Sequence, residues 1–307
     1  MVINAKKDNQ NIGIGIVTYN PDIRQIIHNV AEIDNLQIVI VDNGSDNQFE
    51  LKDNLSRYPK VNIISNDKNL GIACALNQIM EYFLQDGIDW VLTLDQDSQF
   101  EASEISQFID ASNALDLSTV GIMCPIFYDV RTNKRFDNPK EKYHAKNTAS
   151  RFVDVPKCIT SGSLTSVKAW NAIGGFDNFL FIDYVDDDYC YRLNKANYRI
   201  IQMRNVELPH EIGSNPKYVN FLGKKRYLVT YSPFRLYYQT RNFIYLLKKD
   251  KGFSQGEKWE KYRPLRDLIR VLFFERDKIN KTRAILCGLH DGIILRHHSF
   301  EGASNDR

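Results

Sequence analysis

The chain has 307 residues, of which 43% are hydrophobic, 25% charged and 12% aromatic. This is an ordinary composition for a folded protein with one large domain or two small ones, and the net charge of +2 does not indicate nucleic-acid binding by the chain as a whole. The five widely spaced cysteines argue against a disulfide framework and a cysteine zinc site. Neither a secretory signal nor a transmembrane run is predicted, so we expect a cytoplasmic protein.

The first hundred residues alternate short apolar runs with helical patterns. Each predicted strand is apolar on both faces, which is typical of a parallel sheet covered by helices on both sides. In chain order the predicted elements are strand 12–18, helix 23–33, strand 37–41, strand 61–65, helix 72–84 and strand 90–94.

Polar side chains follow each of the four predicted strands. In a parallel sheet the carboxyl ends of the strands meet at one edge, where ligands bind. The sequence therefore predicts a binding site there, formed by residues 18–20, 42–43, 66–67 and 95–97.

The second half differs in charge from the first. It contains a predicted strand at 120–127 and a Gly/Ser-rich segment at 160–163, and from about Ser232 it is helical, basic and aromatic. Residues 223–298 carry 18 Lys/Arg and 7 Asp/Glu, a net charge of +11. This asymmetry indicates a different partner for the second half: nucleic acid, an anionic membrane surface or a phosphorylated acceptor.

Asp95 and Asp97 are the strongest candidates for a metal site. Residues i and i+2 of an extended chain point to the same side, so two carboxylates at a strand end can share a divalent cation. Mg²⁺ and Mn²⁺ prefer oxygen ligands and often join a carboxylate to a diphosphate. The alternative is a solvated turn, because Asp is common in turns.

Two further segments suit a nucleotide. Asp42 can accept a hydrogen bond from the imide N–H of uracil or thymine, although it also suits a turn or a helix N-cap. Residues 66–73 lead through Gly71 into a helix whose N-terminus favours a phosphate or sugar oxygen, and a plain loop before a helix is nearly as compatible.

Four carboxylates crowd into six residues: Asp183, Asp186, Asp187 and Asp188. Such close carboxylates repel one another, which suits either a general base or a solvated helix N-terminus. Two roles are open for His210: a metal ligand and a histidine on the surface. Gly13 and Gly15 lie inside a strand and lack the third glycine of a dinucleotide-binding motif, which excludes that motif.

Taken together, these segments resemble the family 2 glycosyltransferases with the GT-A fold, and among them the bacterial rhamnosyltransferases of polysaccharide assembly. The resemblance extends over about residues 11–245. The matching stretches are IVTYNP (16–21), IVIVDNGS (38–45), NDKNLGIACALNQ (66–78), LTLDQDS (92–98), ITSGSLTS (159–166), IGGFDNFLFIDYVDDDYCYR (173–192), LPHEIGS (208–214) and YSPFRLYYQTRN (231–242).

The resemblance implies an α/β fold, a Rossmann-like and mostly parallel sheet flanked by helices. We expect a catalytic domain over 1–230, with a nucleotide-sugar half at about 11–100 and an acceptor half at about 118–230. A helical, basic region would follow over 231–307.

The resemblance also implies roles for individual residues. Asp186, six residues before Arg192, corresponds to the acceptor base. The expected metal ligands of Mg²⁺ or Mn²⁺ are Asp97, Asp95 and His210. The expected donor-binding residues are Thr18, Asn20, Asp42, Asn43, Asn69, Gly71, Asp95 and Gln96. The expected acceptor-binding residues are Asp187, Asp188 and Gly162.

The implied reaction is inverting transfer of L-rhamnose from dTDP-β-L-rhamnose to a saccharide or lipid-linked saccharide in cell-surface polysaccharide synthesis. UDP-galactose, UDP-glucose and UDP-GlcNAc are alternative donors. A non-catalytic glycan- or nucleic-acid-binding protein is the alternative from another class, and a nucleotidyltransferase would have a Gly-rich opening loop that is absent here.

The basic region has its own predicted partner. Leu265, Ile269 and Leu272 recur at helical spacing within residues 263–283, among several Arg and Lys. Such a segment can lie on an anionic bilayer, which indicates a peripheral contact with the inner face of the plasma membrane and no nucleic-acid partner. The alternatives are a helix that covers the core and a dimer face.

Overall fold

A computed structural model of the chain describes most of its residues. The described residues are 11–33, 36–98, 105–108, 110, 115–129, 134–136, 151–209, 214–221, 224–253 and 262–295. His210 lies outside the described residues.

The chain divides into two compact units. The first comprises Met1–Asn178 and Tyr189–Glu211, and the second comprises Phe179–Asp188 and Ile212–Arg307. The short segment Phe179–Asp188 therefore belongs to the second unit, although in the sequence it lies between the two parts of the first unit. The predicted boundary between a catalytic domain and a C-terminal region at residue 230 stays a prediction.

The first unit contains a nine-stranded mixed sheet in which the first four strands are parallel. Their spatial order is β3-β2-β1-β4. Strands β2 and β3 are therefore added on one side of β1 and β4 on the other, which reverses the order in which strands are added. In doubly wound sheets this reversal creates the crevice that receives ligands. The four strands are β1 (Ile12–Thr18), β2 (Gln37–Asp42), β3 (Val61–Ser65) and β4 (Trp90–Asp95).

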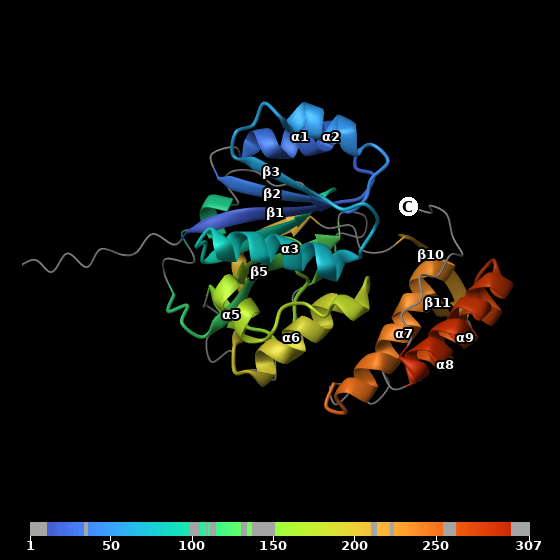
Figure 1. Ribbon diagram of the computed structural model, residues 1–307. Coiled ribbons are helices and arrows are strands. Elements are labelled where there is room, and N and C mark those ends of the chain that lie inside the picture. The colour runs from blue at the N-terminus through green and yellow to red at the C-terminus, as the bar shows by residue number, and fades with distance from the viewer. Residues whose placement is uncertain are drawn as a thin grey trace, which may run out of the picture. The chain divides into compact units, whose positions relative to one another are not determined.

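Helices cover both faces of these strands. In Figure 1, α1 (Ile23–Glu32) and α2 (Gln48–Leu55) lie on one side, and α3 (Ile72–Gln85) lies on the other. A Cβ atom on Gly13 or Gly15 would come within 2.3 Å of the side chain of Phe83 or Ile79 of α3. The two glycines of β1 therefore serve helix packing.

The remaining strands of the first unit extend the sheet beyond β4. Its order continues β4-β8-β5-β9-β7, with β8 antiparallel to β4 and to β5. The strands are β5 (Val120–Asp129), β6 (Lys134–Phe136), β7 (Phe152–Asp154), β8 (Ser163–Ser166) and β9 (Arg199–Pro209). The helices that follow in this part of the chain are α5 (Val167–Ala172), η1 (Asn178–Leu180) and α6 (Val185–Lys195), of which η1 and α6 each have residues in both units.

Among its described residues, the C-terminal part of the second unit contains a β-hairpin and three helices. The hairpin pairs β10 (Ser214–Phe221) with β11 (Lys224–Thr230), and the helices are α7 (Pro233–Lys249), α8 (Arg263–Phe274) and α9 (Lys278–Ile294). The N-cap Ser232 accepts a hydrogen bond from the backbone N–H of Arg235, and Pro233 occupies the first turn, where no backbone donor is needed.

Two glycines allow α9 to pack closely on α7. A Cβ atom on Gly288 would lie 2.5 Å from the carbonyl oxygen of Tyr237, and one on Gly292 would lie 2.7 Å from that of Arg241. The Tyr237 hydroxyl donates to Asp291 of α9 over 2.7 Å, so a buried hydrogen bond accompanies the close packing.

The predicted α/β fold, with a mostly parallel sheet and a helical C-terminal region, is confirmed. The predicted strands at 12–18, 37–41, 61–65 and 90–94 agree with β1 to β4 to within one residue. None of the helices in the described part of the chain is long and apolar enough to cross a membrane.

Candidate functional site

The carboxyl ends of β1, β2 and β4 gather the predicted donor residues. Parallel pairing places Thr18 opposite Asp42 and Val17 opposite Asp95. The three strand ends therefore meet at one edge of the sheet, as the polar strand ends predicted.

Asp42 is fully buried and is held by hydrogen bonds from both neighbouring loops. One carboxylate oxygen accepts from the hydroxyls of Thr18, over 3.2 Å, and of Ser45. The other accepts from the backbone N–H of Ser45 over 3.1 Å and from the Gln48 amide over 2.9 Å. Four donors fill the four acceptor sites of a carboxylate, so a nucleobase must share an oxygen with one of them or displace it.

Asn20 and Asn43 organise the loops around Asp42. The side-chain oxygen of Asn20 accepts from the backbone N–H of Asp46 over 2.8 Å. Asn43 is buried, donates to the side chain of Asn69 and to the carbonyl of Gly71, and accepts from the backbone N–H of Leu70. In this structure both asparagines bond to protein groups; their predicted donor contacts stay predictions.

Residues 66–71 run close beside the loop after β2. Gly44 adopts φ +81°, and a Cβ atom there would lie 2.6 Å from the backbone of Lys68. Asn69 caps the local turn by accepting from the backbone N–H of Gly71 over 2.9 Å, and Gly71, with φ +87°, begins α3. The N-terminus of α3 therefore opens at the same edge of the sheet as Asp42, which suits a phosphate or sugar oxygen.

Asp95 lies at the end of β4, where two serines accept hydrogen bonds from its backbone. Its backbone N–H donates to the hydroxyls of Ser98 and Ser161, over 3.1 and 3.2 Å. Burial, together with the neighbouring carboxylate of Asp97, raises the pKa of Asp95 to about 6, although a hydrogen bond from Ser161 opposes the shift. The site thus disfavours two negative charges in the absence of a positive partner.

Gln96 and Gly162 connect this strand end to its two neighbours. The side-chain oxygen of Gln96 accepts from the backbone N–H of Tyr19 over 2.8 Å, which ties it to the end of β1. The backbone N–H of Gly162 donates to the carbonyl of Thr93 in β4 over 2.7 Å. The Gly/Ser-rich segment therefore lies beside the predicted donor site, and the role of Gly162 in acceptor binding stays a prediction.

The paired carboxylates fit a divalent cation in their chemistry. Asp97 is exposed, Asp95 is only partly buried, and a cation between them would relieve the repulsion that raises the pKa of Asp95. Among the described residues, no three or more His, Cys, Asp or Glu are placed to hold a metal together. Two protein carboxylates with a diphosphate are the usual ligands of Mg²⁺, which keeps few protein ligands.

The acidic cluster belongs to the second unit, at the start of α6. Asp183 is bound by the guanidinium of Arg235 and by the amide of Gln239, the latter over 3.3 Å. The buried Asp188 lies 3.4 Å from the Lys249 ammonium. Asp183 and Asp188 are thus each paired with a cation, which offsets the repulsion within the cluster.

Asp186 and Asp187 are only partly buried in the first turn of α6. A carboxylate in this position interacts favourably with the helix dipole. The roles of Asp186 as base and of Asp187 and Asp188 as acceptor contacts stay predictions.

Ser161 beside Asp95, and Asn77 elsewhere in the first unit, make contacts that the sequence did not predict. Ser161 supports Asp95, and the Gly/Ser-rich composition of 160–163 was its signal. Asn77 of α3 accepts from the backbone N–H of Phe176 and the indole of Trp170, and donates to the carbonyl of Phe176 and to Asn178. Nothing local marks an asparagine in the middle of a helix for this role.

Comparison with known proteins identifies the family of the chain. The model of the family described as glycosyl transferase family 2 matches residues 14–174, just over half of the chain. The dTDP-rhamnosyl transferase RfbF of Shigella flexneri is 32% identical over 254 residues, which cover 79% of this chain and 81% of the relative. The chain therefore belongs to glycosyl transferase family 2, is similar to a rhamnosyltransferase, and is a glycosyltransferase enzyme.

A cytidylyltransferase from Leptospira borgpetersenii serovar Hardjo-bovis (strain JB197) is a similar solved structure. It is 7% identical, with a TM-score of 0.40, and the alignment covers 81% of this chain and 98% of that one. The family assignment does not depend on it.

Proposed function

We propose that this enzyme transfers L-rhamnose from dTDP-β-L-rhamnose to a saccharide or a lipid-linked saccharide in cell-surface polysaccharide synthesis. The observation that carries the proposal is the gathering of Asp42, Asp95 and Gln96 at one edge of the sheet, beside the N-terminus of α3. The similarity to a dTDP-rhamnosyl transferase over most of both chains supports rhamnose as the sugar.

The donor would bind along this edge of the first unit. Asp42 would accept from the imide N–H of the base, Asp95 and Gln96 would lie at the ribose and diphosphate, and the loop of Asn69 and Gly71 would meet a phosphate or sugar oxygen. The polar contacts of Thr18, Asn20 and Asn43 keep these loops in place before the donor arrives. Such preorganisation lowers the cost of binding.

A divalent cation, Mg²⁺ or Mn²⁺, would be held by Asp97 and Asp95, with His210 as a third ligand. When bound, it supplies positive charge beside the diphosphate leaving group. The carboxylates of this chain contribute by fixing that charge at the edge of the sheet where the diphosphate would lie.

The transfer would be a single displacement with inversion. Asp186 accepts the proton of the acceptor hydroxyl, and the freed oxygen forms a bond to the anomeric carbon of rhamnose. The bond from that carbon to the diphosphate oxygen breaks, and its electron pair leaves with dTDP. The product is an α-L-rhamnoside, with Asp187, Asp188 and Gly162 as contacts to the acceptor.

A donor panel tests this proposal. We expect the purified protein, with Mg²⁺ or Mn²⁺, to hydrolyse dTDP-β-L-rhamnose faster than UDP-galactose, UDP-glucose or UDP-GlcNAc. Faster hydrolysis of a UDP-sugar would show that rhamnose is not the preferred donor sugar, while the proposal of glycosyl transfer would stand. Failure to bind dTDP or UDP in a metal-dependent manner would favour a non-catalytic glycan-binding role.

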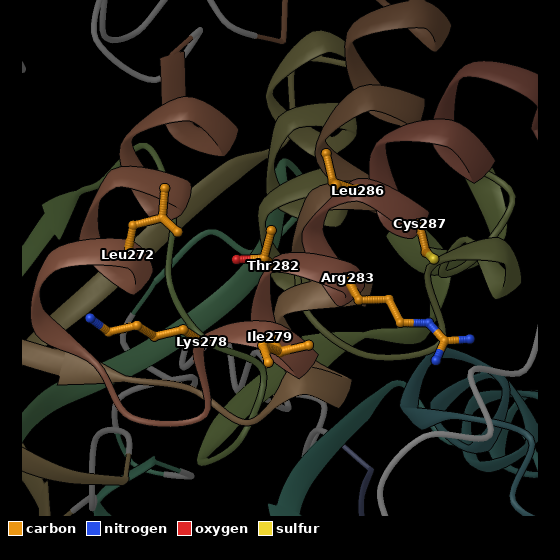
Figure 2. Close-up of a pocket in the computed structure, with 7 residues that line it drawn as sticks. All are labelled: Leu272, Lys278, Ile279, Thr282, Arg283, Leu286 and Cys287. Carbon is orange, nitrogen blue, oxygen red and sulfur yellow. The ribbon is translucent and has the colours of Figure 1, made fainter.

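The second unit offers a surface suited to an anionic membrane. Apolar side chains of α8 and α9 are well exposed: Leu265 56%, Ile269 47%, Leu272 44%, Phe273 72%, Ile279 82% and Leu286 53%. Between α8 and α9, Leu272, Ile279 and Leu286 line a hollow of about 470 Å³, and Figure 2 shows Lys278 and Arg283 extending their charged ends to either side of Ile279. Apolar residues flanked by cations match acyl chains below anionic headgroups.

Two of the basic residues within 263–283 form ion pairs inside the second unit instead of contributing to this surface. Arg270 and Lys281 bind the buried carboxylate of Glu275, over 2.7 and 2.6 Å, and so join α8 to α9. Arg266, Arg276, Lys278 and Arg283 are exposed. We propose that these four residues and the exposed apolar residues place a cytoplasmic enzyme on the inner face of the plasma membrane.

Vesicle sedimentation tests the membrane contact. Wild-type protein should pellet with vesicles of phosphatidylcholine and phosphatidylglycerol, and much less with phosphatidylcholine alone. Phe273→Ser and Ile279→Ser, at the most exposed apolar positions of α8 and α9, should reduce pelleting. If these variants pelleted normally but changed a dimer into a monomer, the surface would be a subunit interface and the membrane proposal would fail.

A further inference from the structure

A turn with unusual backbone geometry directly precedes the proposed base. Phe181, Asp183 and Tyr184 adopt left-handed conformations, with φ of 55°, 63° and 65°, although none is glycine. Such conformations persist only where the surroundings impose them, and they concentrate at functional sites. The carbonyl of Tyr184 accepts the first hydrogen bond of α6, from the backbone N–H of Asp188 over 2.9 Å. The conformation of the 179–184 turn therefore sets the start of the helix that carries Asp186.

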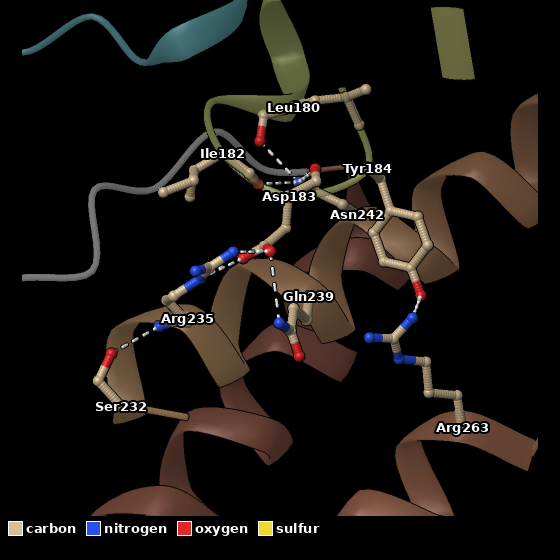
Figure 3. A network of polar contacts seen from close by, with 9 residues as sticks. All are labelled: Leu180, Ile182, Asp183, Tyr184, Ser232, Arg235, Gln239, Asn242 and Arg263. Atoms are coloured by element: carbon tan, nitrogen blue, oxygen red, sulfur yellow. Dashed lines mark hydrogen bonds and ion pairs between the residues drawn. The ribbon is translucent and has the colours of Figure 1, made fainter. Parts of the chain in front are cut away.

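One buried side chain binds most of this turn. The amide nitrogen of Asn242 in α7 donates to the carbonyl oxygens of Leu180, Ile182 and Asp183, over 2.6, 2.8 and 2.9 Å. Figure 3 shows this nitrogen pointing into the turn. Because Asn242 is fully buried, water cannot replace its donors if they are removed.

Arg241 orients the amide of Asn242. Its guanidinium donates to the side-chain oxygen of Asn242, over 2.9 Å from Nε and 2.7 Å from Nη2, and also to the carbonyl of Phe179. With the oxygen facing Arg241, the amide nitrogen must face the turn. Arg241 is buried against the rings of Phe179 and Tyr238, with its Cζ at 4.5 and 4.6 Å from their centroids.

The same face of α7 also binds the side chains of the turn. Arg235 and Gln239 bind the carboxylate of Asp183, and the ring of Tyr238 stacks on that of Phe181 at 4.9 Å. Residues 235, 239 and 242 are spaced as i, i+4 and i+7, so one helix face makes all these contacts. This arrangement gives a physical role to the YSPFRLYYQTRN stretch.

We propose that Asn242, oriented by Arg241, is a positioning residue for Asp186. It fixes the left-handed 179–184 turn, and the turn fixes the first helical turn of α6. The buried guanidinium of Arg241 donates to the neutral oxygens of Asn242 and Phe179, and a charge buried in this way is costly if stability alone is the requirement, which favours a functional role. The inference rests on the proposed role of Asp186 in glycosyl transfer.

Asn242→Asp tests the inference with little change in volume. The carboxylate keeps its contacts with Arg241 but presents an oxygen, in place of two donors, to three carbonyl oxygens. We expect faster hydrogen–deuterium exchange of amides 180–188 and a fall of roughly tenfold or more in kcat for hydrolysis of dTDP-β-L-rhamnose. The Kd of dTDP with Mn²⁺ should change less than about twofold, because the donor residues belong to the first unit. Asn280→Asp, an exposed change of the same kind in α9, is the control.

The outcomes separate the positioning role from a purely structural one. Unchanged exchange in the turn, or faster exchange with unchanged kcat, overturns the inference. A parallel loss of kcat and of dTDP affinity indicates general unfolding and also overturns it. If Asn242→Asp does not fold, Arg235→Gln must show the same two changes at smaller size, and if it shows neither the inference fails. Wild-type protein that does not turn over the donor refutes the proposed function instead, and the exchange data still test the turn.

Discussion

Polar side chains form hydrogen-bond networks in both units, but strand pairing assembles the network of the first unit and long-range side-chain contacts assemble that of the second. At the edge of the sheet, strand pairing alone places Thr18 beside Asp42 and Val17 beside Asp95. In the second unit, Asn242 reaches carbonyl groups that lie 59 to 62 residues earlier in the chain. A regular sheet creates the first arrangement, whereas specific side-chain contacts create the second.

This difference predicts that the first unit determines binding and the second unit determines turnover, and substitutions can test that separation. If the first unit binds donor and metal, substitutions there should change binding constants. If the Phe179–Asp188 segment of the second unit carries the base, substitutions there should change turnover and leave binding constant.

Asp186→Asn should have the largest effect. Removing a general base costs about 10²- to 10⁴-fold in rate, so kcat for hydrolysis of dTDP-β-L-rhamnose should fall by at least about a hundredfold. The Kd of dTDP with Mn²⁺, measured by calorimetry, should stay within about twofold. Asp187→Asn, one residue along the same helix, should lose less activity. Near-normal turnover by Asp186→Asn would show that Asp186 is not the general base.

Asp97→Asn should show the opposite pattern. Loss of an outer-shell partner already costs roughly 10- to 100-fold in metal affinity, and Asp97 is a proposed direct ligand, so Mn²⁺-dependent dTDP binding should weaken by more than that. The exposed Asp89→Asn, just before the opposite end of β4, is the matched control and should bind normally. Equal affinities for wild-type protein and Asp97→Asn would contradict the metal site.

The sequence predicted the first unit better than the second for a physical reason. Apolar runs ending in polar residues give strands and strand ends, and parallel pairing then places Asp42 and Asp95 at one edge. The Gly/Ser-rich composition marked residues 160–163, but no local pattern could reveal that Ser161 supports Asp95 or that Thr18 donates to Asp42, because these partners lie 66 and 24 residues apart in the chain.

The sequence placed α7 correctly but did not explain its motif. The helical, aromatic and basic pattern after Ser232 indicated a helix, and the resemblance marked the YSPFRLYYQTRN stretch. The left-handed turn that Asn242 binds has no sequence signal, since Phe181, Asp183 and Tyr184 are not residues that favour this conformation as glycine does. Burial of Arg241 and Asn242 likewise follows only from tertiary packing.

Gly288→Ala should separate the stability of the second unit from donor binding. The added methyl group would lie 2.5 Å from the Tyr237 carbonyl, so α7 and α9 must move apart at a cost of roughly 1–3 kcal/mol. We expect a lower free energy of unfolding in urea and an unchanged Kd for dTDP. Leu286→Ala, at a half-exposed position on the same helix, should stay within about 0.5 kcal/mol. Loss of dTDP affinity in Gly288→Ala would show that the units do not act separately.

The smallest predicted effect is a pH dependence of metal binding at the first unit. The pKa of Asp95 is raised to about 6, so in the metal-free protein Asp95 is protonated below this pH and Mn²⁺ must displace the proton. Affinity for Mn²⁺ with dTDP should therefore fall about tenfold for each pH unit below 6 through this group, and level off above it. The raised pKa also means that the metal-free fold loses stability as pH rises from the ordinary Asp value of 3.8 to about 6.

Asp95→Asn provides the comparison that isolates this group. The diphosphate of dTDP also titrates, but its contribution is common to both proteins, so the difference between their pH profiles belongs to Asp95. The variant should bind Mn²⁺ and dTDP more weakly than wild type above pH 6, and the gap should narrow toward about pH 5 as the wild-type carboxylate becomes protonated. In the metal-free state the variant should be the more stable protein above pH 6, since it lacks the charge that burial and Asp97 oppose. A gap in Mn²⁺ affinity that stayed constant over this range would mean that Asp95 does not ligate the metal, and the sheet edge would then bind the cation through Asp97 without it.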